Sequence, residues 1–182
     1  MNIAIVYDSG YGHTAKQAQA VAEGVERVAG ASAILLPVAD NPEPWDILAS
    51  CDAIILGSPT YNGTISARLK AFMEASTKEA FVAQKWRNKI AAGFTNSGAM
   101  HGDKLNSLMT MVLFAAQSAM IWVGLDLFPG RSAQDRNRVG GWIGAMAQSN
   151  DESPELSPIR SDLETAAHLG QRVAEITGRF AG

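Results

Sequence analysis

Short apolar segments rich in β-branched residues recur along the chain and predict strands at 3–7, 33–36, 53–56, 90–94 and 120–123. Between most of them, apolar residues are spaced three or four apart, as in a helix that lays one face on a sheet. We therefore expect helices at 18–29, 65–73 and 105–112. A last helix is expected at 163–174, with Ser161 as its cap.

Strands that are apolar on both faces and alternate with helices indicate a parallel sheet covered on both sides. The pattern thus predicts a doubly wound α/β fold, as a single domain over 1–182. The connection 37–51 carries three prolines and is expected to hold only a short helix. The long Gly-rich stretch 124–158 is expected to be a functional or interface-forming loop.

Composition and charge narrow the class of partner. The chain is 47% hydrophobic and 18% charged, with a net charge of −3, so neither nucleic acid nor an anionic membrane is an expected partner. Its apolar runs fall far short of the roughly 20 residues that cross a bilayer, and no signal peptide is visible. We therefore expect a cytoplasmic protein that acts on small molecules.

Cys51 is the only cysteine, so an intrachain disulfide and a cluster of thiolate metal ligands are both excluded. We expect it to be a small buried hydrophobic residue, and we expect no metal site.

Ligands of doubly wound sheets bind at the carboxyl ends of the strands. The first predicted strand is followed by 8–14, in which Gly10 and Gly12 permit tight turns and Ser9 and Thr14 add hydroxyl donors. Because this segment runs into a helix, whose first N–H groups are unpaired and partly positive, it predicts a phosphate site.

Gly10, Gly12 and Ala15 also fit the loose dinucleotide fingerprint G-x-G-x-x-A. That interpretation needs an acidic residue at the end of the second strand to hold the ribose. The strand ends Leu35-Leu36-Pro37 and Asp40 lies past it, which favours a mononucleotide, although a turn without any ligand stays open.

Two further loops follow the third and fourth strands, at 57–63 and 95–102. Their small and polar residues let backbone amides approach a flat polar ring, and Tyr61 could stack on it. We expect all three loops to meet at one edge of the sheet.

The first loop is similar to the flavodoxin phosphate signature, with Ser9, Gly12 and Thr14 in register and Tyr11 in place of a threonine. With the loops Gly57-Ser58-Pro59-Thr60-Tyr61-Asn62-Gly63 and Phe94-Thr95-Asn96-Ser97-Gly98, it resembles the flavodoxin-like NAD(P)H:quinone oxidoreductases of the WrbA type. The resemblance implies five parallel strands in the order 2-1-3-4-5, with helices on both faces, and bound FMN. The cofactor-binding residues it implies are Ser9, Gly10, Tyr11, Gly12, His13, Thr14, Pro59, Thr60, Tyr61, Asn62, Gly63, Asn96, Ser97, Gly98, Ala99, Met100 and His101.

The resemblance also implies a function in which NADH or NADPH reduces FMN and the flavin reduces a quinone or similar small acceptor. No side chain need act as a nucleophile, and Tyr11 and His101 are the candidate substrate-site residues. The chain departs from the family's run of glycines at Met100-His101-Gly102. Two alternatives stay open: a flavodoxin-type electron carrier that docks on redox proteins, and an interaction module that has lost FMN.

The resemblance further implies a homodimer or homotetramer. Four apolar residues of the last third of the chain could form an interface or belong to the core: Trp122, Phe128, Trp142 and Met146.

Overall fold

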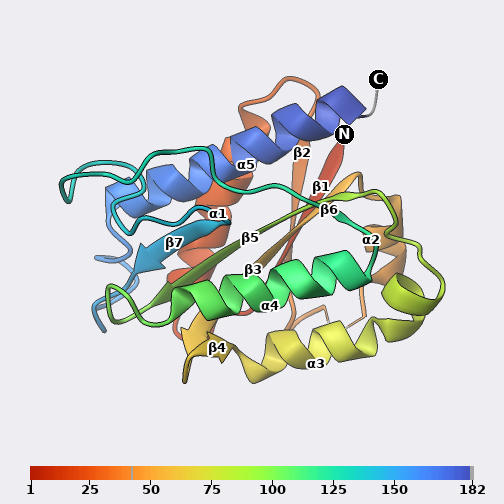
Figure 1. The fold of residues 1–182 in the computed structure, drawn as a ribbon, viewed down its shortest axis with the longest axis horizontal. Helices are drawn as coiled ribbons and strands as arrows, with labels where there is room; N and C mark the ends of the chain where they lie inside the picture. Colours follow the sequence, from red (N-terminus) through yellow and green to blue (C-terminus); the bar gives the residue numbers. More distant parts are fainter. Residues whose placement is uncertain (42, 181–182) are drawn as a thin grey trace.

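The computed structural model describes residues 1–41 and 43–180. A twisted sheet lies between two layers of helices (Figure 1). Its principal strands are parallel and run in the order β2-β1-β3-β5-β6, which confirms the predicted order 2-1-3-4-5. Their bounds are β1 Asn2–Tyr7, β2 Ser32–Pro37, β3 Ala53–Tyr61, β5 Ile90–Ser97 and β6 Ile121–Trp122.

Two further strands make the predicted number of five wrong. β4 (Thr64–Ile65) pairs antiparallel with the end of β3. β7 (Ala145–Gln148) pairs parallel with Phe94–Ser97, the second half of β5, whereas β6 pairs with Ile90 and Ala91 in its first half. The two strands thus share one edge of β5. β7 lies inside the stretch expected to be a loop. It was not predicted as a strand because it contains no β-branched residue.

The helices form two layers (Figure 1). One face of the sheet is covered by α1 (His13–Glu26) and α5 (Arg160–Phe180). The other face is covered by α2 (Trp45–Ser50), α3 (Ala67–Ala75) and α4 (Lys104–Gln117), with a π-helical turn at Lys78–Val82. The short helix expected between the second and third strands is therefore confirmed as α2.

Three helix boundaries differ from the prediction. Ile65 belongs to β4 and not to a helix, and Ala29 lies beyond the end of α1. Ser161 lies inside the first turn of α5, where its hydroxyl donates to the carbonyl of Ala133 (2.6 Å) and caps nothing. For Ile65 and Ala29, the helical spacing of apolar residues continues beyond the end of the helix. For Ser161, the helix begins before the residue expected to cap it.

Alternate residues of β1 supply two separate cores. Ile3 and Ile5 pack under α1 and α5, whereas Ala4 and Val6 pack under the opposite helices. This alternation follows from the two-residue period of a strand and explains why the strands are apolar at every position.

Several side chains test the burial expected from sequence. Cys51 is free and buried, as predicted. Leu105 and Met109, which the helical spacing assigned to the face on the sheet, are 56% and 40% exposed. Trp122 and Met146 pack against the core, whereas Phe128 and Trp142 are exposed and contact each other edge to face.

α1 and α5 approach each other at two glycines. A Cβ built on Gly24 would lie 1.8 Å from the carbonyl oxygen of Ala167, and one built on Gly170 would lie 2.0 Å from that of Val21. The two helix backbones are thus in direct contact, at a spacing that no larger residue allows.

Within residues 1–41 and 43–180, no helix combines the length and the apolar character needed to span a bilayer.

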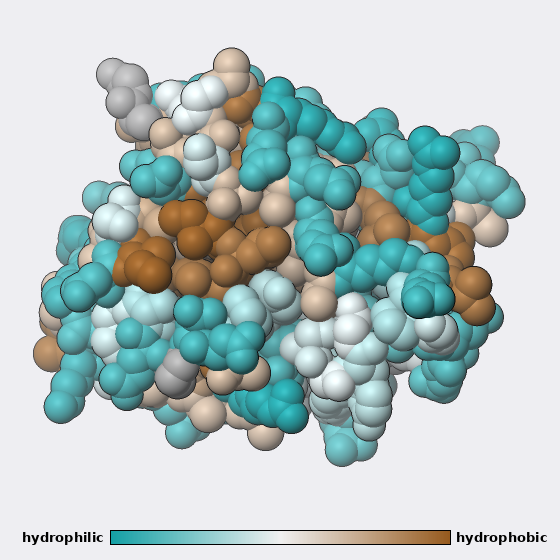
Figure 2. Space-filling view, turned by 180° about the vertical axis from the view of Figure 1, so that it is seen from behind, coloured by the Kyte–Doolittle hydropathy of each residue, from teal (hydrophilic) through white to brown (hydrophobic). Residues whose placement is uncertain are grey.

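The face turned away from the view of Figure 1 carries an apolar patch bordered by polar side chains (Figure 2). β2 is an edge strand of the sheet, and its Leu35 is 38% exposed.

Candidate functional site

Three segments meet at the carboxyl edge of the sheet, as the sequence predicted. β3 and β5 are longer than expected, so that Pro59 and Asn96 are paired residues of adjacent strands and not loop residues. The end of β1 joins them through a hydrogen bond from the N–H of Asp8 to the carbonyl of Gly57 (3.0 Å). The first loop therefore begins beside the extended ends of β3 and β5.

The segment between β1 and α1 is folded around one hydroxyl. Ser9 Oγ accepts hydrogen bonds from the N–H groups of Gly12 and Ala15, each at 3.1 Å. Its own hydrogen stays available to a ligand. Gly12 has φ +93°, a left-handed conformation that disfavours a side chain. As the N-cap residue of α1 it has no side chain to cap the helix, and Ser9 Oγ caps only the N–H of Ala15.

The open start of α1 is suited to an anion. The N–H groups of Tyr11, His13 and Thr14 donate to no acceptor in the described part of the chain. Thr14 Oγ1 accepts from Asn96 Nδ2 (2.7 Å), and both side chains are buried, so the threonine hydroxyl also keeps its hydrogen for a ligand. Unpaired N–H groups at a helix N-terminus carry partial positive charge, which favours a phosphate.

A cavity of about 370 Å³ lies beside this helix start. Its volume is within the range of small-molecule sites. Of the residues predicted to bind the cofactor, six line it: Tyr11, His13, Tyr61, Asn96, Ser97 and Gly98.

Two tyrosines form the aromatic part of the cavity. The rings of Tyr11 and Tyr61 meet edge to face with centroids 6.4 Å apart, and Tyr11 is 76% exposed. Partial burial, and then the neighbouring Tyr11 and Asp8, raises the pKa of the Tyr61 phenol. Tyr61 therefore stays protonated at neutral pH and can donate a hydrogen bond.

A fourth segment, which follows β7, lines the cavity as well. It lies within the stretch 124–158 that the sequence indicated as a functional or interface-forming loop, but none of its residues was named as a site residue. It contributes Ser149, Asp151, Glu152 and Pro154 to the cavity. Because β7 runs parallel to β5, its carboxyl end lies at the same edge of the sheet. A prediction of β7 as a strand would therefore have placed these residues at the site.

This fourth segment is fastened to the first loop. His13 donates from Nε2 to the carbonyl of Glu152 (2.7 Å), and Lys16 Nζ donates to the carbonyl of Glu155 (3.0 Å). A Cβ on Gly12 would come within 3.1 Å of Pro154. The space over the helix start is thus bounded closely on one side.

The remaining predicted residues lie around the cavity and not in its wall. The hydroxyl of Thr60 is buried, 2.8 Å from that of Thr95 and 2.7 Å from that of Ser107, so its side chain does not reach the cavity. Asn62 and Gly63 form the turn between β3 and β4. The ring of His101 is exposed and accepts the N–H of Asp103 at Nδ1 (3.2 Å).

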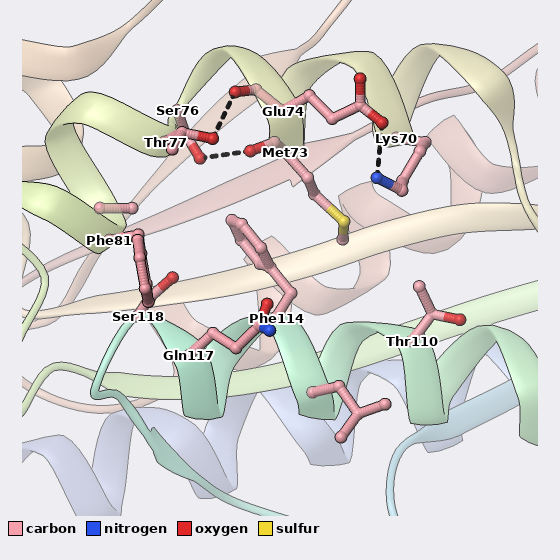
Figure 3. A pocket seen from close by; sticks show the side chains of 12 residues that line it. Lys70, Met73, Glu74, Ser76, Thr77, Phe81, Thr110, Phe114, Gln117 and Ser118 are labelled. Atoms are coloured by element: carbon pink, nitrogen blue, oxygen red, sulfur yellow. Dashed lines mark hydrogen bonds and ion pairs between the residues drawn. The ribbon is translucent and has the colours of Figure 1, made fainter.

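A second cavity of about 420 Å³ lies between α3 and α4 (Figure 3). Met73 and Phe114 point toward each other across it, and Lys70 pairs with Glu74 at its rim (2.6 Å). None of the residues predicted to bind the cofactor lines it. It also lies on the helical layer, away from the strand ends where ligands of this fold class bind.

The residues at the sheet edge fit FMN. The phosphate would meet the free N–H groups of Tyr11, His13 and Thr14, together with the hydroxyls of Ser9 and Thr14. Among the described residues, no lysine or arginine lines the cavity, so that backbone N–H groups and hydroxyls would be the main partners of the phosphate.

Comparisons with known proteins identify the family of the chain. Residues 1–128 match the model of the NADPH-dependent FMN reductase family. A solved flavodoxin, a WrbA-like protein from Agrobacterium tumefaciens, is 39% identical, with a TM-score of 0.76 over 98% of both chains.

Two curated relatives are also similar over most of their length. Flavodoxin FldP of Pseudomonas aeruginosa (strain UCBPP-PA14) is 40% identical over 178 residues, which cover 94% of each chain. An NAD(P)H dehydrogenase (quinone) of Geobacter sulfurreducens is 33% identical over 205 aligned positions that cover all of both chains. The chain therefore belongs to the NADPH-dependent FMN reductase family, as a WrbA-type, FMN-dependent NAD(P)H oxidoreductase with a flavodoxin-like fold.

Proposed function

We propose that this chain, as a single flavodoxin-like domain over 1–182, passes electrons from NAD(P)H through FMN to a quinone or similar small acceptor. The observation that carries the proposal is the cavity of about 370 Å³, with free N–H groups of a helix start on one side and an exposed tyrosine pair on another. The relative from Geobacter sulfurreducens, named an NAD(P)H dehydrogenase (quinone), supports the choice of acceptor.

The residues of the chain bind and orient, and bound FMN supplies the two-electron redox chemistry. In our proposal the phosphate lies on the segment 9–14, and the flavin ring lies between the end of β3 and the segment 96–101. Tyr11 is exposed at the rim, where it can receive a flat ring by stacking. The proposed cofactor-binding residues are those named from the sequence, joined by the segment 149–154.

The position of the phosphate is tested by the substitution Gly12→Ala. A methyl group at Gly12 would strain the left-handed backbone, at about 1–2 kcal/mol in an L-residue. Its carbon would also lie 3.1 Å from Pro154, so that the segment 149–154 must shift slightly. We expect FMN to bind at least about tenfold more weakly in a fluorescence titration, since 1.4 kcal/mol is a factor of ten. Gly30→Ala is the matched control, because Gly30 has φ +79° with no atom within 4 Å of its Cβ position. Equal FMN affinity of both variants would refute the proposed position.

A second function is favoured by one comparison. Flavodoxin FldP, at 40% identity, carries the name of an electron carrier. Such a carrier would bind FMN in the same cavity but would exchange electrons with a protein partner and not with nicotinamide.

Anaerobic stopped-flow absorbance separates the two functions. The FMN-loaded protein is mixed with NADPH or NADH while the oxidised flavin band is followed. We expect rapid bleaching that a quinone reverses, and the faster nucleotide identifies the donor. Bound flavin that neither nucleotide reduces would refute the oxidoreductase proposal and favour the carrier.

We also propose a homodimer or homotetramer, in which the exposed pair Phe128 and Trp142 contributes to the interface. Phe128 is 85% exposed and Trp142 is 52% exposed, and large exposed aromatic residues are typical of interfaces. Light scattering tests this, and Phe128→Ser is expected to lower the molar mass. A cytoplasmic location is proposed from the sequence, and cell fractionation tests it.

A further inference from the structure

Lys104 lies buried behind the loop that follows β5. It is the first residue of α4 and is only 1% exposed. Its Nζ donates to the carbonyls of Ala99 (2.7 Å) and Met100 (2.8 Å). Buried ammonium groups are rare, because removing the charge from water is costly unless it is paired. Here the charge holds two consecutive carbonyls of the loop whose first residues line the cavity.

A second buried cation lies nearby. Arg138 and Asp162 form a bidentate ion pair at 2.8 and 2.7 Å, with side chains 8% and 1% exposed. Asp162 also accepts the N–H of Gln148 at the end of β7 (3.0 Å), and Arg138 Nη1 lies 3.7 Å from Met100 Sδ. Two cations and one carboxylate leave one positive charge in excess behind the loop.

The other charged groups near this loop face solvent or the cavity. His101 and Asp103 have side chains 86% and 72% exposed, so water screens them. Asp151 lies next to Gly98 in the wall of the cavity. None of them is buried beside the ammonium of Lys104. The carboxylates of Asp151 and Glu152 line the cavity itself and oppose part of the effect of the excess positive charge there.

We propose that Lys104 is a positioning residue that orders the loop 97–103 for the cofactor and, through the excess buried charge, favours reduced over oxidised FMN. This inference rests on the proposed position of the flavin ring beside Asn96–Gly98. Two-electron reduction of FMN leaves an extra negative charge on its ring near neutral pH. A cation held close by in a low-dielectric setting stabilises that charge, and charge near the ring is a principal means of flavin tuning.

The effect depends on pH with a defined sign. Burial lowers the pKa of Lys104 to about 8, with Asp162 opposing the shift and Arg138 adding to it. The cation is therefore present below about pH 8 and is lost as the pH rises through this value. By linkage, the preference of Lys104⁺ for reduced FMN means that reduced FMN raises the pKa of Lys104.

The test is the midpoint potential of bound FMN, measured by spectroelectrochemistry from pH 6 to 10. We expect Lys104→Gln, which keeps a hydrogen-bond donor but removes the charge, to weaken the binding of reduced relative to oxidised FMN about tenfold. That ratio equals a potential about 30 mV more negative for a two-electron couple. We also expect the variant to lose the inflection near pH 8.

Lys89→Gln is the matched control. Lys89 Nζ likewise donates to two carbonyls, those of Ala49 and Cys51, and burial likewise lowers its pKa. It precedes β5, and the 8 residues of that strand place it about 26 Å from the loop. An equal potential shift in both variants, or none in Lys104→Gln, would overturn the proposal.

A measurement on the unaltered protein keeps the proposal testable if a variant does not fold. NMR titration of the Lys104 side chain, with oxidised and then with reduced FMN, is expected to give the higher pKa with reduced FMN. Equal values would refute the inference. If Gly12→Ala also left FMN binding unchanged, the proposed site would fail; if only the Lys104 measurements failed, the site would stand.

Discussion

Gly170 of α5 offers a prediction whose sign depends on the tertiary structure. In an isolated helix, Gly→Ala stabilises by about 1 kcal/mol. Here the new Cβ would lie 2.0 Å from the carbonyl oxygen of Val21 and 3.1 Å from the N–H nitrogen of Val25. Both are backbone atoms of α1, so no rotamer change can relieve the contact.

The size of the effect follows from the missing space. Ordinary contact begins at 3.4 Å, so α1 and α5 must separate by more than 1 Å near this point. A gap of that size forfeits a quarter to a half of the dispersion energy of the facing atoms, which include Ala166, Leu169 and Val173 of the core. With overpacking costs of 1–3 kcal/mol or more, we expect a net loss of about 2–4 kcal/mol in the free energy of unfolding.

Urea unfolding followed by circular dichroism measures the loss in the free energy of unfolding of Gly170→Ala. Thermal unfolding of the same variant is expected to give a Tm lower by about 5–15 °C. Gly178→Ala on the same helix is the control, because its Cβ would meet only Met1 at an ordinary 3.7 Å. We expect that control to be neutral or slightly stabilising. A Gly170→Ala variant as stable as the unaltered protein would show that the backbone contact between α1 and α5 has been misjudged.

Three further changes test other parts of the structure. Asp162→Asn leaves the buried Arg138 unpaired and is expected to lower the free energy of unfolding in urea by about 3–5 kcal/mol. Arg160→Ala breaks the ion pair with Glu164, in which Arg160 is 91% exposed, and should cost less than about 1 kcal/mol. Equal losses would contradict the burial argument. Lys104 binds its proton more weakly in the folded protein than in the unfolded chain. This group should therefore raise the free energy of unfolding by about 3 kcal/mol between about pH 8 and 10.5. If that sign is right, the free energy of unfolding of Lys104→Met should vary less with pH. Cys51 is buried, and burial raises the pKa of its thiol. A thiol reagent at pH 8 should therefore label the folded protein much more slowly than the protein unfolded in urea, and fast labelling of the folded protein would disprove its burial.

The alternation of strands and helices predicted the layers and the strand order because the central strands β1, β3 and β5 each serve two cores. The apolar residues of β1 at consecutive positions could only belong to a strand covered on both faces. β7 escaped prediction because Ala145 and Ala147 are small residues that bury well but have weak strand preference. The lengths of β3 and β5 escaped it because polar residues at strand ends resemble loops.

The candidate site was predicted to a similar depth. The segment 9–14 has local signals, since glycines and hydroxyls before a helix indicate an anion site without knowledge of the fold. The segment 149–154 has none, because its place in the site depends on β7. Lys104 carries the opposite signal, since a lysine at a helix start is ordinarily solvated, and only the fold over the loop 97–103 buries it.

The shared edge of β5 has a consequence for how this chain can vary. β6 and β7 occupy successive halves of one strand position, and the chain leaves the sheet between them. The residues between β6 and β7 form an excursion from the sheet. The N–H of Leu125 donates to the carbonyl of Trp142 (2.7 Å), so this excursion departs and returns at nearly the same point. An excursion closed at its base can gain or lose residues at an entropic cost that grows only slowly with length. Chain length can therefore change here without a shift in the register of the sheet.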